Sequence, residues 1–390
     1  MYETLQALFW LALASLLYTY LGFPVLVAVV GKILARKVHR EPIEPTVSLI
    51  IAAYNEEREI AARLRNAMNL DYPAKRLEVI VASDGSTDRT ERIVASIRDP
   101  RIRLLSLPRR GKLAALTQAV HHAYGDILVF SDANSMYRRD ALRALVRNFA
   151  DPEVGGVAGH TAYRIEEKSE SSSHGENLYW NYDAWLKQLE SDTGSIVSAH
   201  GGIYAIRREL FSPVPDPAVT DDFSISTGVI EKGKRLVFDS DALALETAVP
   251  SAAQEFRRRV RLMTRGLRSV LLRRRLLNPF KYGFYSVVLF THKVLRRLLA
   301  FALAILFVSS LLLAGQHWFY AAAALAQSFA YALALAGWML KGTATGRRRM
   351  FYVPFFYCFA NLACALAWFN LFRGRRISIW QPQRHPAQTL

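Results

Sequence analysis

The residues best suited to chemistry stand where an apolar run gives way to a short polar one. Residues 127–130 are all apolar, as is typical of a buried strand, and Ser131, Asp132 and Asn134 follow. In open α/β sheets, ligands bind outside the carboxyl ends of the strands, where these side chains are expected. Their oxygen atoms suit Mg²⁺ or Mn²⁺ better than zinc. The segment therefore predicts a divalent-metal site at Asp132 and Asn134.

Three more acidic residues stand at other predicted turns: Asp84, Asp221 and Asp222. Alone, Asp84 before a glycine is typical of an ordinary turn, and Asp221-Asp222 of an ordinary helix start. Together with Asp132 they flank one predicted sheet edge, which favours a shared pocket. Such a pocket could hold a metal-bound diphosphate, with one carboxylate left over for proton transfer.

These residues need a framework that brings distant strand ends together. From residue 47 onward, predicted strands and helices alternate, which is typical of an α/β domain with a mostly parallel sheet. The acidic residues would then meet at the carboxyl edge of that sheet. The pattern predicts strands at 47–53, 77–82, 101–107, 127–130, 201–206 and 235–238, and helices at 57–70, 112–124, 140–149, 177–189 and 221–231.

The composition points to a membrane. The chain has 390 residues, is 52% hydrophobic and carries a formal net charge of +17. Excess positive charge is typical of proteins that meet nucleic acid, anionic membranes or phosphate-bearing substrates. Long apolar runs favour the membrane and exclude a nucleic-acid protein. The two cysteines, Cys358 and Cys364, lie inside one such run, so no disulfide framework is indicated.

The first apolar run covers residues 5–30, which is long enough to cross ~30 Å of hydrocarbon. Basic residues follow it, whereas the charges of a signal peptide precede its apolar core. By the positive-inside rule, this basic end is cytoplasmic. The run is therefore interpreted as a membrane anchor.

Three further runs, 298–314, 318–340 and 351–372, are also long enough to span. The loop 315–317 has no Lys or Arg and suits the outside, whereas the basic loop 341–349 suits the inside. Three crossings would leave the basic tail outside, against the rule. Three explanations stay open. The last run is re-entrant, another segment crosses the membrane, or the charge rule is overridden here.

The Arg-rich stretch 254–275 has apolar residues at helical spacing, which predicts an amphipathic helix on an anionic membrane surface; a plain solvated helix is the alternative. The predicted organisation is an anchor at 1–40, a cytoplasmic catalytic domain at 41–250, amphipathic interfacial helices at 251–295, transmembrane helices at 296–372 and a basic tail at 373–390.

Five short motifs occur in a specific order. They are Ala-Tyr-Asn-Glu-Glu at 53–57, Ser-Asp-Gly-Ser-Thr-Asp at 83–88, Gly-Lys at 111–112, Ser-Asp-Ala-Asn at 131–134 and Thr-Asp-Asp at 220–222. The ordered set resembles the membrane-embedded family 2 glycosyltransferases, which have a GT-A nucleotide-diphospho-sugar transferase fold. Synthases of cellulose, hyaluronan and poly-N-acetylglucosamine form the group that it resembles. The resemblance covers about residues 47–272 and the arrangement of flanking spans.

The resemblance implies roles for single residues. Asp222 would be the general base, and Asp132 would face the diphosphate and the metal. The acceptor and the diphosphate would be held near Asp221. Those implied to bind the nucleotide sugar are Tyr54, Glu56, Asp84, Lys112 and Asp132, and those implied on the acceptor and diphosphate side also include Gly201, Gly202, Arg258 and Arg261.

The sequence departs from the family at two motifs. The family often has Asp-X-Asp, where this chain has Asp132-Ala133-Asn134, so one charge is missing from the expected metal site. The processive synthases carry Gln-X-X-Arg-Trp, where this chain has the basic segment 258–262 without a tryptophan. Trp380 in the tail is a candidate substitute for stacking on an acceptor sugar.

The resemblance implies an inverting hexosyltransferase of the bacterial inner membrane with a cytoplasmic catalytic domain. It would move a hexose or N-acetylhexosamine from a UDP-sugar to a growing exopolysaccharide, with Mg²⁺ or Mn²⁺ as cofactor. Its partners would be the donor, a glycan or lipid-linked acceptor, membrane lipids and export or accessory subunits, but no nucleic acid. The alternatives are single-sugar transfer to a lipid carrier and a non-catalytic membrane partner of the same fold.

Overall fold

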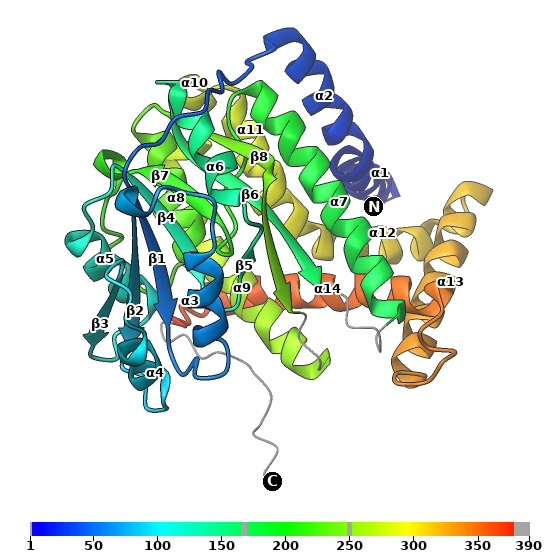
Figure 1. Cartoon of the computed structure of the whole chain (residues 1–390). Coiled ribbons are helices and arrows are strands. Elements are labelled where there is room, and N and C mark those ends of the chain that lie inside the picture. The colour runs from blue at the N-terminus through cyan, green and yellow to red at the C-terminus, as the bar shows by residue number, and fades with distance from the viewer. Residues whose placement is uncertain (1, 165–169, 248–251, 378–390) are drawn as a thin grey trace.

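The computed structural model describes residues 2–164, 170–247 and 252–377, so Trp380 lies outside the described residues. The α/β part of the chain is built on one eight-stranded sheet with the strand order β3-β2-β1-β4-β7-β6-β8-β5. Figure 1 shows this sheet beside a separate group of long helices. The predicted α/β architecture is confirmed.

Four neighbouring strands are parallel: β1 (Val47–Ala53), β2 (Leu77–Asp84), β3 (Ile102–Leu107) and β4 (Ile127–Asp132). β1, β2 and most of β4 are buried, because helices cover both faces of a parallel sheet. The register sets Ala52 opposite Asp132 and Ala53 opposite Ser83. The carboxyl ends that carry Asp84 and Asp132 therefore lie at one edge.

The other half of the sheet is mixed. β7 (Tyr204–Arg207) runs antiparallel to both β4 and β6 (Val154–Arg164). β8 (Arg235–Thr247) is parallel to β6, and the short β5 (Met136–Tyr137) is antiparallel to β8. Six strands therefore run in one direction and only β5 and β7 run against them, so the sheet is mostly parallel as expected. β8 also runs beyond residue 238, its predicted end, and carries further side chains to the active edge.

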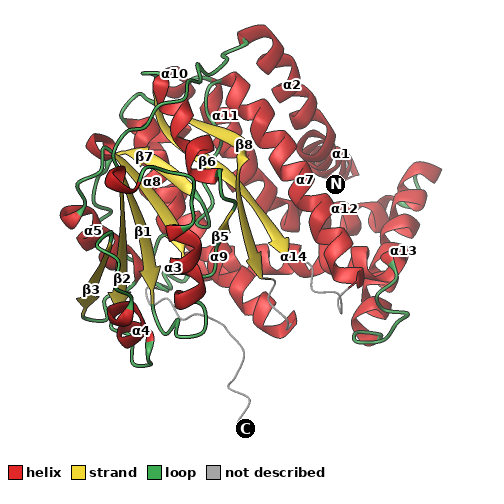
Figure 2. Ribbon diagram, in the orientation of Figure 1, coloured by secondary structure: helices red, strands yellow, loops and turns green. Residues whose placement is uncertain are grey.

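Helices cover the sheet on both sides (Figure 2). One apolar core packs α5 (Lys112–His122), α7 (Glu170–Thr193) and α8 (Asp221–Glu231) on one face of the sheet. The second core packs α3 (Ile60–Met68) and α6 (Ala141–Val146), together with α4 (Thr90–Ser96), on the opposite face. The sheet is therefore a buried layer, and its carboxyl edge is fixed from both sides.

Within the described residues, four helical runs are long and apolar enough to cross a membrane, which indicates a membrane protein. The first covers Tyr2–Leu34 and joins α1 (Tyr2–Leu17) through a π turn to α2 (Phe23–Leu34). Its upper part, α2, packs on α7, where Gly31 approaches the backbone of Leu189. The first helical run is thus continuous with the surface of the α/β part of the chain.

The other three runs are Phe284–Leu313, α13 (Trp318–Met339) and α14 (Arg349–Phe372). The first of these contains α11 (Phe284–Phe290), a π turn and α12 (Arg296–Leu313). Its helical backbone passes without a break through the predicted boundary at 295 and 296. Before it come α9 (Ala252–Leu272) and α10 (Pro279–Tyr282). The division into domains as a whole stays a prediction.

Candidate active site

Lys112 joins two of the predicted site residues. It stands in the first turn of α5, after Gly111, whose φ of 97° is a conformation that favours glycine. Its Nζ lies 2.6 Å from Oδ1 of Asp132 and 2.8 Å from Oδ2 of Asp221. Burial alone would lower the pKa of Lys112, but these two carboxylates raise it above its usual value. Lys112 is therefore a fixed positive charge between the end of β4 and the start of α8.

Gly201 marks the centre of the site. A Cβ placed on Gly201 would lie 3.4 Å from Oδ2 of Asp132, 3.6 Å from Nζ of Lys112 and 3.9 Å from Oδ2 of Asp222. The loop before β7, the end of β4 and the start of α8 therefore converge at one point. Because glycine has no side chain, space is left between these three polar groups.

The two neighbouring aspartates at the start of α8 have different environments. Burial raises the pKa of Asp222 above its ordinary value, and the charge of Asp221 raises it further. Burial also opposes ionisation of Asp221, but Lys112 and Arg265 hold the pKa of Asp221 below the usual range. Paired carboxylates with separated pKa values are typical of acid–base sites. Asp222 is the member of the pair that is suited to accept a proton.

α9 holds the start of α8 in place. Ser269 on α9 accepts a hydrogen bond from the backbone N–H of Thr220 at 2.9 Å. The buried guanidinium of Arg265 donates through Nε to the carbonyl oxygen of Val219 at 3.1 Å and also contacts it through Nη2. Two side chains of one helix therefore fix the backbone that carries Asp222.

Asp84 lies at the other end of the site. It is separated from Asp132 by strand β1, which sets the two strands ~10 Å apart. The Asp84 carboxylate accepts hydrogen bonds from the backbone N–H groups of Arg110, at 2.8 Å, and Gly111, and it also pairs with the Arg109 side chain. The Arg109 guanidinium lies 3.4 Å from the centre of the Tyr54 ring. Tyr54, Asp84 and the loop before α5 thus form one continuous wall.

The remaining predicted residues line the site or its edges. The buried Glu56 follows β1, and its backbone N–H donates to the hydroxyl of Thr90 at 2.7 Å. Arg258 and Arg261 lie on the half-buried face of α9. Burial lowers the pKa of His200, and the nearby charge of Arg258 lowers it slightly further. Burial lowers the pKa of Arg261, and its neighbours Arg258 and Arg265 lower it further. α9 therefore supplies a positive wall beside the carboxylates.

The residues present fit a divalent ion that is shared with a substrate. Among the described residues, no three His, Cys, Asp or Glu side chains group closely enough to hold a metal alone. Oδ2 of Asp132 faces the space beside Gly201, and the half-buried Asn134 follows in the next turn. Mg²⁺ is typically held by one or two carboxylates, with substrate phosphates completing the shell. Asp132 and Asn134 are suited to this arrangement.

Sequence reasoning missed Glu246, which lies beneath Gly202. The Glu246 side chain is buried and accepts a hydrogen bond from the hydroxyl of Ser135 at 2.6 Å. A Cβ on Gly202 would come within 2.4 Å of Oε1 of Glu246. Glu246 belongs to the part of β8 beyond the predicted strand, so no pattern in the sequence placed it here.

His200 and Arg109 were also missed. His200 precedes Gly201 and lies close to Asp132, and burial is the main cause that lowers its pKa. Arg109 stands two residues before the Gly-Lys motif. It is recognised as a site residue only from its contacts with Tyr54 and Asp84 in the folded chain.

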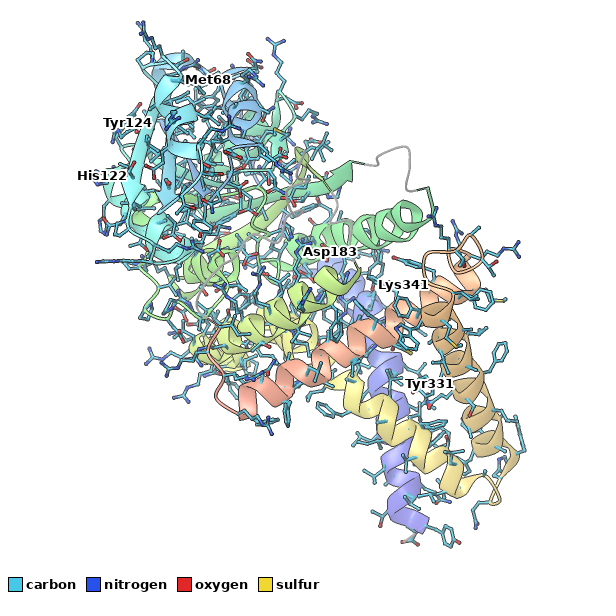
Figure 3. All side chains as sticks on the ribbon, turned by 90° about the horizontal axis from the view of Figure 1, so that it is seen from below. Met68, His122, Tyr124, Asp183, Tyr331 and Lys341 are labelled. Atoms are coloured by element: carbon cyan, nitrogen blue, oxygen red, sulfur yellow. The ribbon has the colours of Figure 1, made fainter. Side chains whose placement is uncertain are left out.

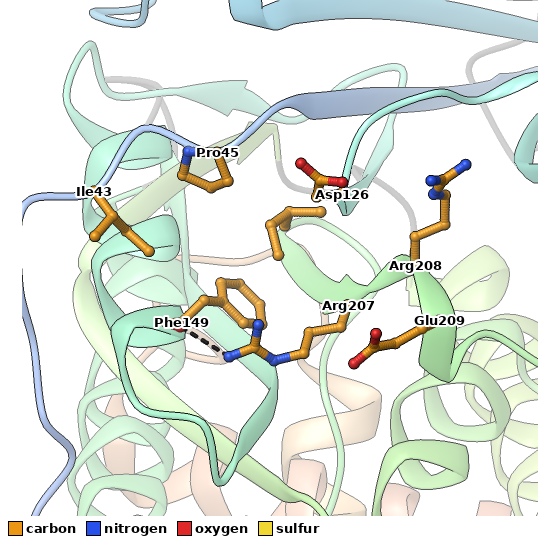
Figure 4. A pocket seen from close by; sticks show the side chains of 8 residues that line it. Ile43, Pro45, Asp126, Phe149, Arg207, Arg208 and Glu209 are labelled. Carbon is orange, nitrogen blue, oxygen red and sulfur yellow. Dashed lines mark hydrogen bonds between the residues drawn. The ribbon is translucent and has the colours of Figure 1, made fainter.

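A separate pocket of about 180 Å³ lies at the opposite end of the sheet, near the starts of β1 and β4. Figure 4 shows it lined by Pro45, Asp126, Arg207 and Arg208, among others. Arg207 is already engaged there, because its guanidinium donates to the carbonyl oxygen of Phe149 at 2.8 Å. This pocket is not part of the candidate active site.

The sheet topology and the carboxylate edge together define a GT-A fold. Residues 48–214 match the model of glycosyl transferase family 2. It has the fold of the solved mannosyltransferase PcManGT from Pyrobaculum calidifontis, in complex with GDP-Man and Mn2+. The TM-score is 0.70 and the identity 25%, over 95% of this chain and 100% of that one.

Two curated proteins with similar sequences differ in product. The chain is 30% identical over 190 residues to the beta-monoglucosyldiacylglycerol synthase of Nostoc sp. (strain PCC 7120 / SAG 25.82 / UTEX 2576), covering 47% of this chain and 40% of that protein. It is 26% identical over 234 residues to the poly-beta-1,6-N-acetyl-D-glucosamine synthase of Staphylococcus aureus (strain COL), covering 58% and 56%. The chain thus spans about half the length of these relatives.

Proposed function

We propose that this protein is an inverting glycosyltransferase that moves a hexose or N-acetylhexosamine from a UDP-sugar to a growing glycan chain at the bacterial inner membrane. The observation that supports this most is the convergence of Asp132, Lys112 and Asp222 around Gly201. The catalytic domain would lie in the cytoplasm, where nucleotide sugars are made, and the acceptor would come from the membrane side.

The proposed reaction is one direct displacement. The Asp222 carboxylate takes the proton from the acceptor hydroxyl while the hydroxyl oxygen attacks the anomeric carbon. The bond from that carbon to the diphosphate breaks, and UDP leaves with the bonding electrons. Attack from the opposite face inverts the carbon, so an α-linked donor gives a β-linked product.

The other residues bind and orient the donor. Tyr54, Asp84 and the loop before α5 would hold the base and ribose, and Asp132 with Asn134 would hold Mg²⁺ or Mn²⁺. The ion would supply positive charge to the leaving diphosphate. Lys112 and the arginines Arg258 and Arg261 would add fixed positive charge nearby. The solved relative was crystallised with Mn2+, which supports this cofactor class.

Transfer of a single sugar to a lipid carrier is the second candidate. Two observations favour it: the segment 258–262 lacks the tryptophan of the processive synthases, and a similar protein is named as a glycolipid synthase. A third possibility, a non-catalytic membrane partner with this fold, predicts binding without turnover.

Radiolabelled donors would distinguish these possibilities. The purified full-length protein in detergent would be given UDP-glucose, UDP-N-acetylglucosamine, UDP-galactose or GDP-mannose, with and without Mn²⁺, and membrane lipid extract as acceptor source. A ladder of products supports the polymerase, and one labelled glycolipid supports the lipid alternative. Asp222→Asn should abolish transfer while donor binding persists. Full transfer by that variant would refute the assignment of the base, and no turnover of any donor would refute the enzyme.

A further inference from the structure

The last apolar helix, α14, is oriented differently from the other membrane runs. In Figure 1 it lies crosswise below the sheet, and α13 passes across it at one end. Figure 3, seen from below, likewise shows α14 running across the directions of α1, α12 and α13. Length and hydropathy alone admit it as a span. Its direction relative to its neighbours argues against a crossing.

We propose that α14 lies flat in the membrane surface on the side of the catalytic domain, so that this chain crosses the membrane three times. The lipid layer is the partner of its exposed face, and the basic tail stays on the catalytic side.

The contacts of α14 with α9 support this placement. The rings of Phe256 and Phe359 lie 4.8 Å apart, and the Arg259 guanidinium lies 4.4 Å from the centre of the Phe356 ring. Further along, Nδ2 of Asn370 lies 3.4 Å from the hydroxyl of Thr264. The two helices therefore lie side by side over much of the length of α9. α9 is itself packed on the catalytic domain through Arg265 and Ser269. Because α14 runs alongside α9, it stays at the surface of that domain and does not cross the bilayer.

Both ends of α14 lie on the catalytic side. At its start, the end of α13 packs against it, since a Cβ on Gly337 would come within 2.5 Å of the carbonyl oxygen of Phe351. Figure 3 shows Lys341, in the connecting loop, closer to the catalytic domain than Tyr331 is. At the other end, burial alone would raise the pKa of Asp216, before α8, but the backbone N–H of Ala218 and the Arg268 side chain hold it below its usual value. The charge of Arg376 contributes to the same lowering of that pKa. A helix that crossed ~30 Å of hydrocarbon would separate its ends instead.

The level at which α14 meets the first run agrees with a membrane boundary. The rings of Tyr20 and Tyr357 lie 6.1 Å apart. At 1.5 Å per residue, the helix from Tyr2 to Tyr20 measures ~27 Å, close to the hydrocarbon thickness. Tyrosine is enriched at membrane–water interfaces. α14 thus crosses the first run where that run is expected to leave the lipid.

The side chains of α14 divide as an interfacial helix requires. Ala363, Cys364 and Ala367 are buried on the protein side. The opposite side is exposed and apolar at Met350 near the start of the helix and at Leu362, Phe369 and Phe372 further along. Arginines stand at both ends of the helix, at 347–349 and 373–376, where anionic headgroups would meet them.

This placement removes the topological conflict of the sequence. The uncharged loop 315–317 then lies on the far side together with the start of α1, and the basic loop 341–349 and the tail lie with the catalytic domain. All segments rich in arginine are on one side of the membrane.

Cysteine accessibility tests the proposal. In a background with Cys358→Ala and Cys364→Ala, single changes Ala95→Cys, Gln316→Cys, Thr345→Cys and Arg373→Cys would be labelled with a membrane-impermeant maleimide in right-side-out and inverted vesicles. All four positions are exposed. We expect Arg373→Cys to react from the same side as Ala95→Cys and Thr345→Cys, and Gln316→Cys from the opposite side. Reaction of Arg373→Cys together with Gln316→Cys would overturn the proposal.

The depth of the helix is an independent measurement. Spin labels at Met350→Cys, Asn361→Cys and Phe372→Cys would report their depth in liposomes through collision with oxygen and with a water-soluble nickel chelate. These positions are spaced by eleven residues and therefore share one face of the helix, which is exposed at both ends. An in-plane helix predicts similar shallow depths at all three positions. A deep value at position 361 between two shallow ends would mean a crossing helix and would refute the in-plane placement even if tail labelling failed.

Discussion

Nζ of Lys112 lies 2.6 Å from the carboxylate of Asp132, and the same ammonium reaches Asp221 at 2.8 Å. One positive charge therefore links the end of strand β4 to the first turn of helix α8. Asp221 is far from Lys112 and Asp132 in the sequence, and its contact with Lys112 closes the candidate active site. The predictions below concern this link and the groups around it.

Lys112→Met should impair transfer more than folding. The variant leaves two carboxylates without their shared counter-charge, which costs about 1–3 kcal/mol in the free energy of unfolding. The loss of a fixed charge near the diphosphate is expected to reduce kcat about 10²–10³-fold. Thermal unfolding and donor turnover would be measured together. Lys75→Met, at an exposed position in a turn, is the matched control and should behave as the unmodified protein; normal turnover by Lys112→Met would contradict the role.

The two adjacent glycines should respond differently to alanine. In Gly201→Ala, the new methyl group makes ordinary contacts of 3.4 Å or more, so the protein should fold but lose activity because substrate space is filled. In Gly202→Ala, the methyl group meets the buried Glu246 at 2.4 Å, which should destabilise the fold by about 1–3 kcal/mol. Thermal unfolding with donor turnover separates the two effects. Equal stability of both variants would contradict this geometry.

Ser269→Ala should lower kcat without weakening donor binding. Its hydroxyl accepts the N–H of Thr220, and the loss of this bond costs about 1 kcal/mol and loosens the backbone before Asp222. The expected result is a several-fold fall in kcat with an unchanged KM for the donor. Ser286→Ala removes a comparable buried hydroxyl, one that donates to the carbonyl of Leu276 at 2.8 Å, and serves as the control. A change confined to KM would argue against a positioning role.

Asp221→Asn should shift the pH dependence of transfer. Asp222 must be ionised to accept a proton, so the rate falls as the pH drops through its pKa. Burial and the charge of Asp221 raise that pKa. Removal of the Asp221 charge lowers the pKa of Asp222, which moves the acid limb of the kcat profile to lower pH. A limb that stays in place or moves to higher pH would rule out Asp222 as the titrating base.

Chelation of divalent ions should stop transfer, and Mn²⁺ or Mg²⁺ should restore it. Asn134 contributes an oxygen without charge, so Asn134→Asp should lower the Mn²⁺ concentration needed for half-maximal activity several-fold, and Asn134→Ala should raise it. Calorimetric titration of Mn²⁺ in the presence of UDP gives a second readout. If all three proteins required the same concentration, Asn134 would not be a ligand.

The sequence alone determined the framework. Buried apolar runs defined β1, β2 and β4, and the acidic residues that follow two of them had to meet at one edge because parallel strands share it. The order of the motifs gave the fold, and the apolar runs gave the membrane segments. These signals are local or periodic, so they can be recognised in the sequence without knowledge of tertiary contacts.

Only the tertiary structure decided the rest. Glu246 reaches Gly202 because β8 continues past its apolar part, and Arg109 joins Tyr54 to Asp84 through a loop that has no pattern of its own. Likewise, α14 reads as a span by length and hydropathy, yet its contacts with α9 lay it crosswise. Hydropathy measures how well a helix tolerates lipid and carries no information on its direction, which packing between distant segments sets.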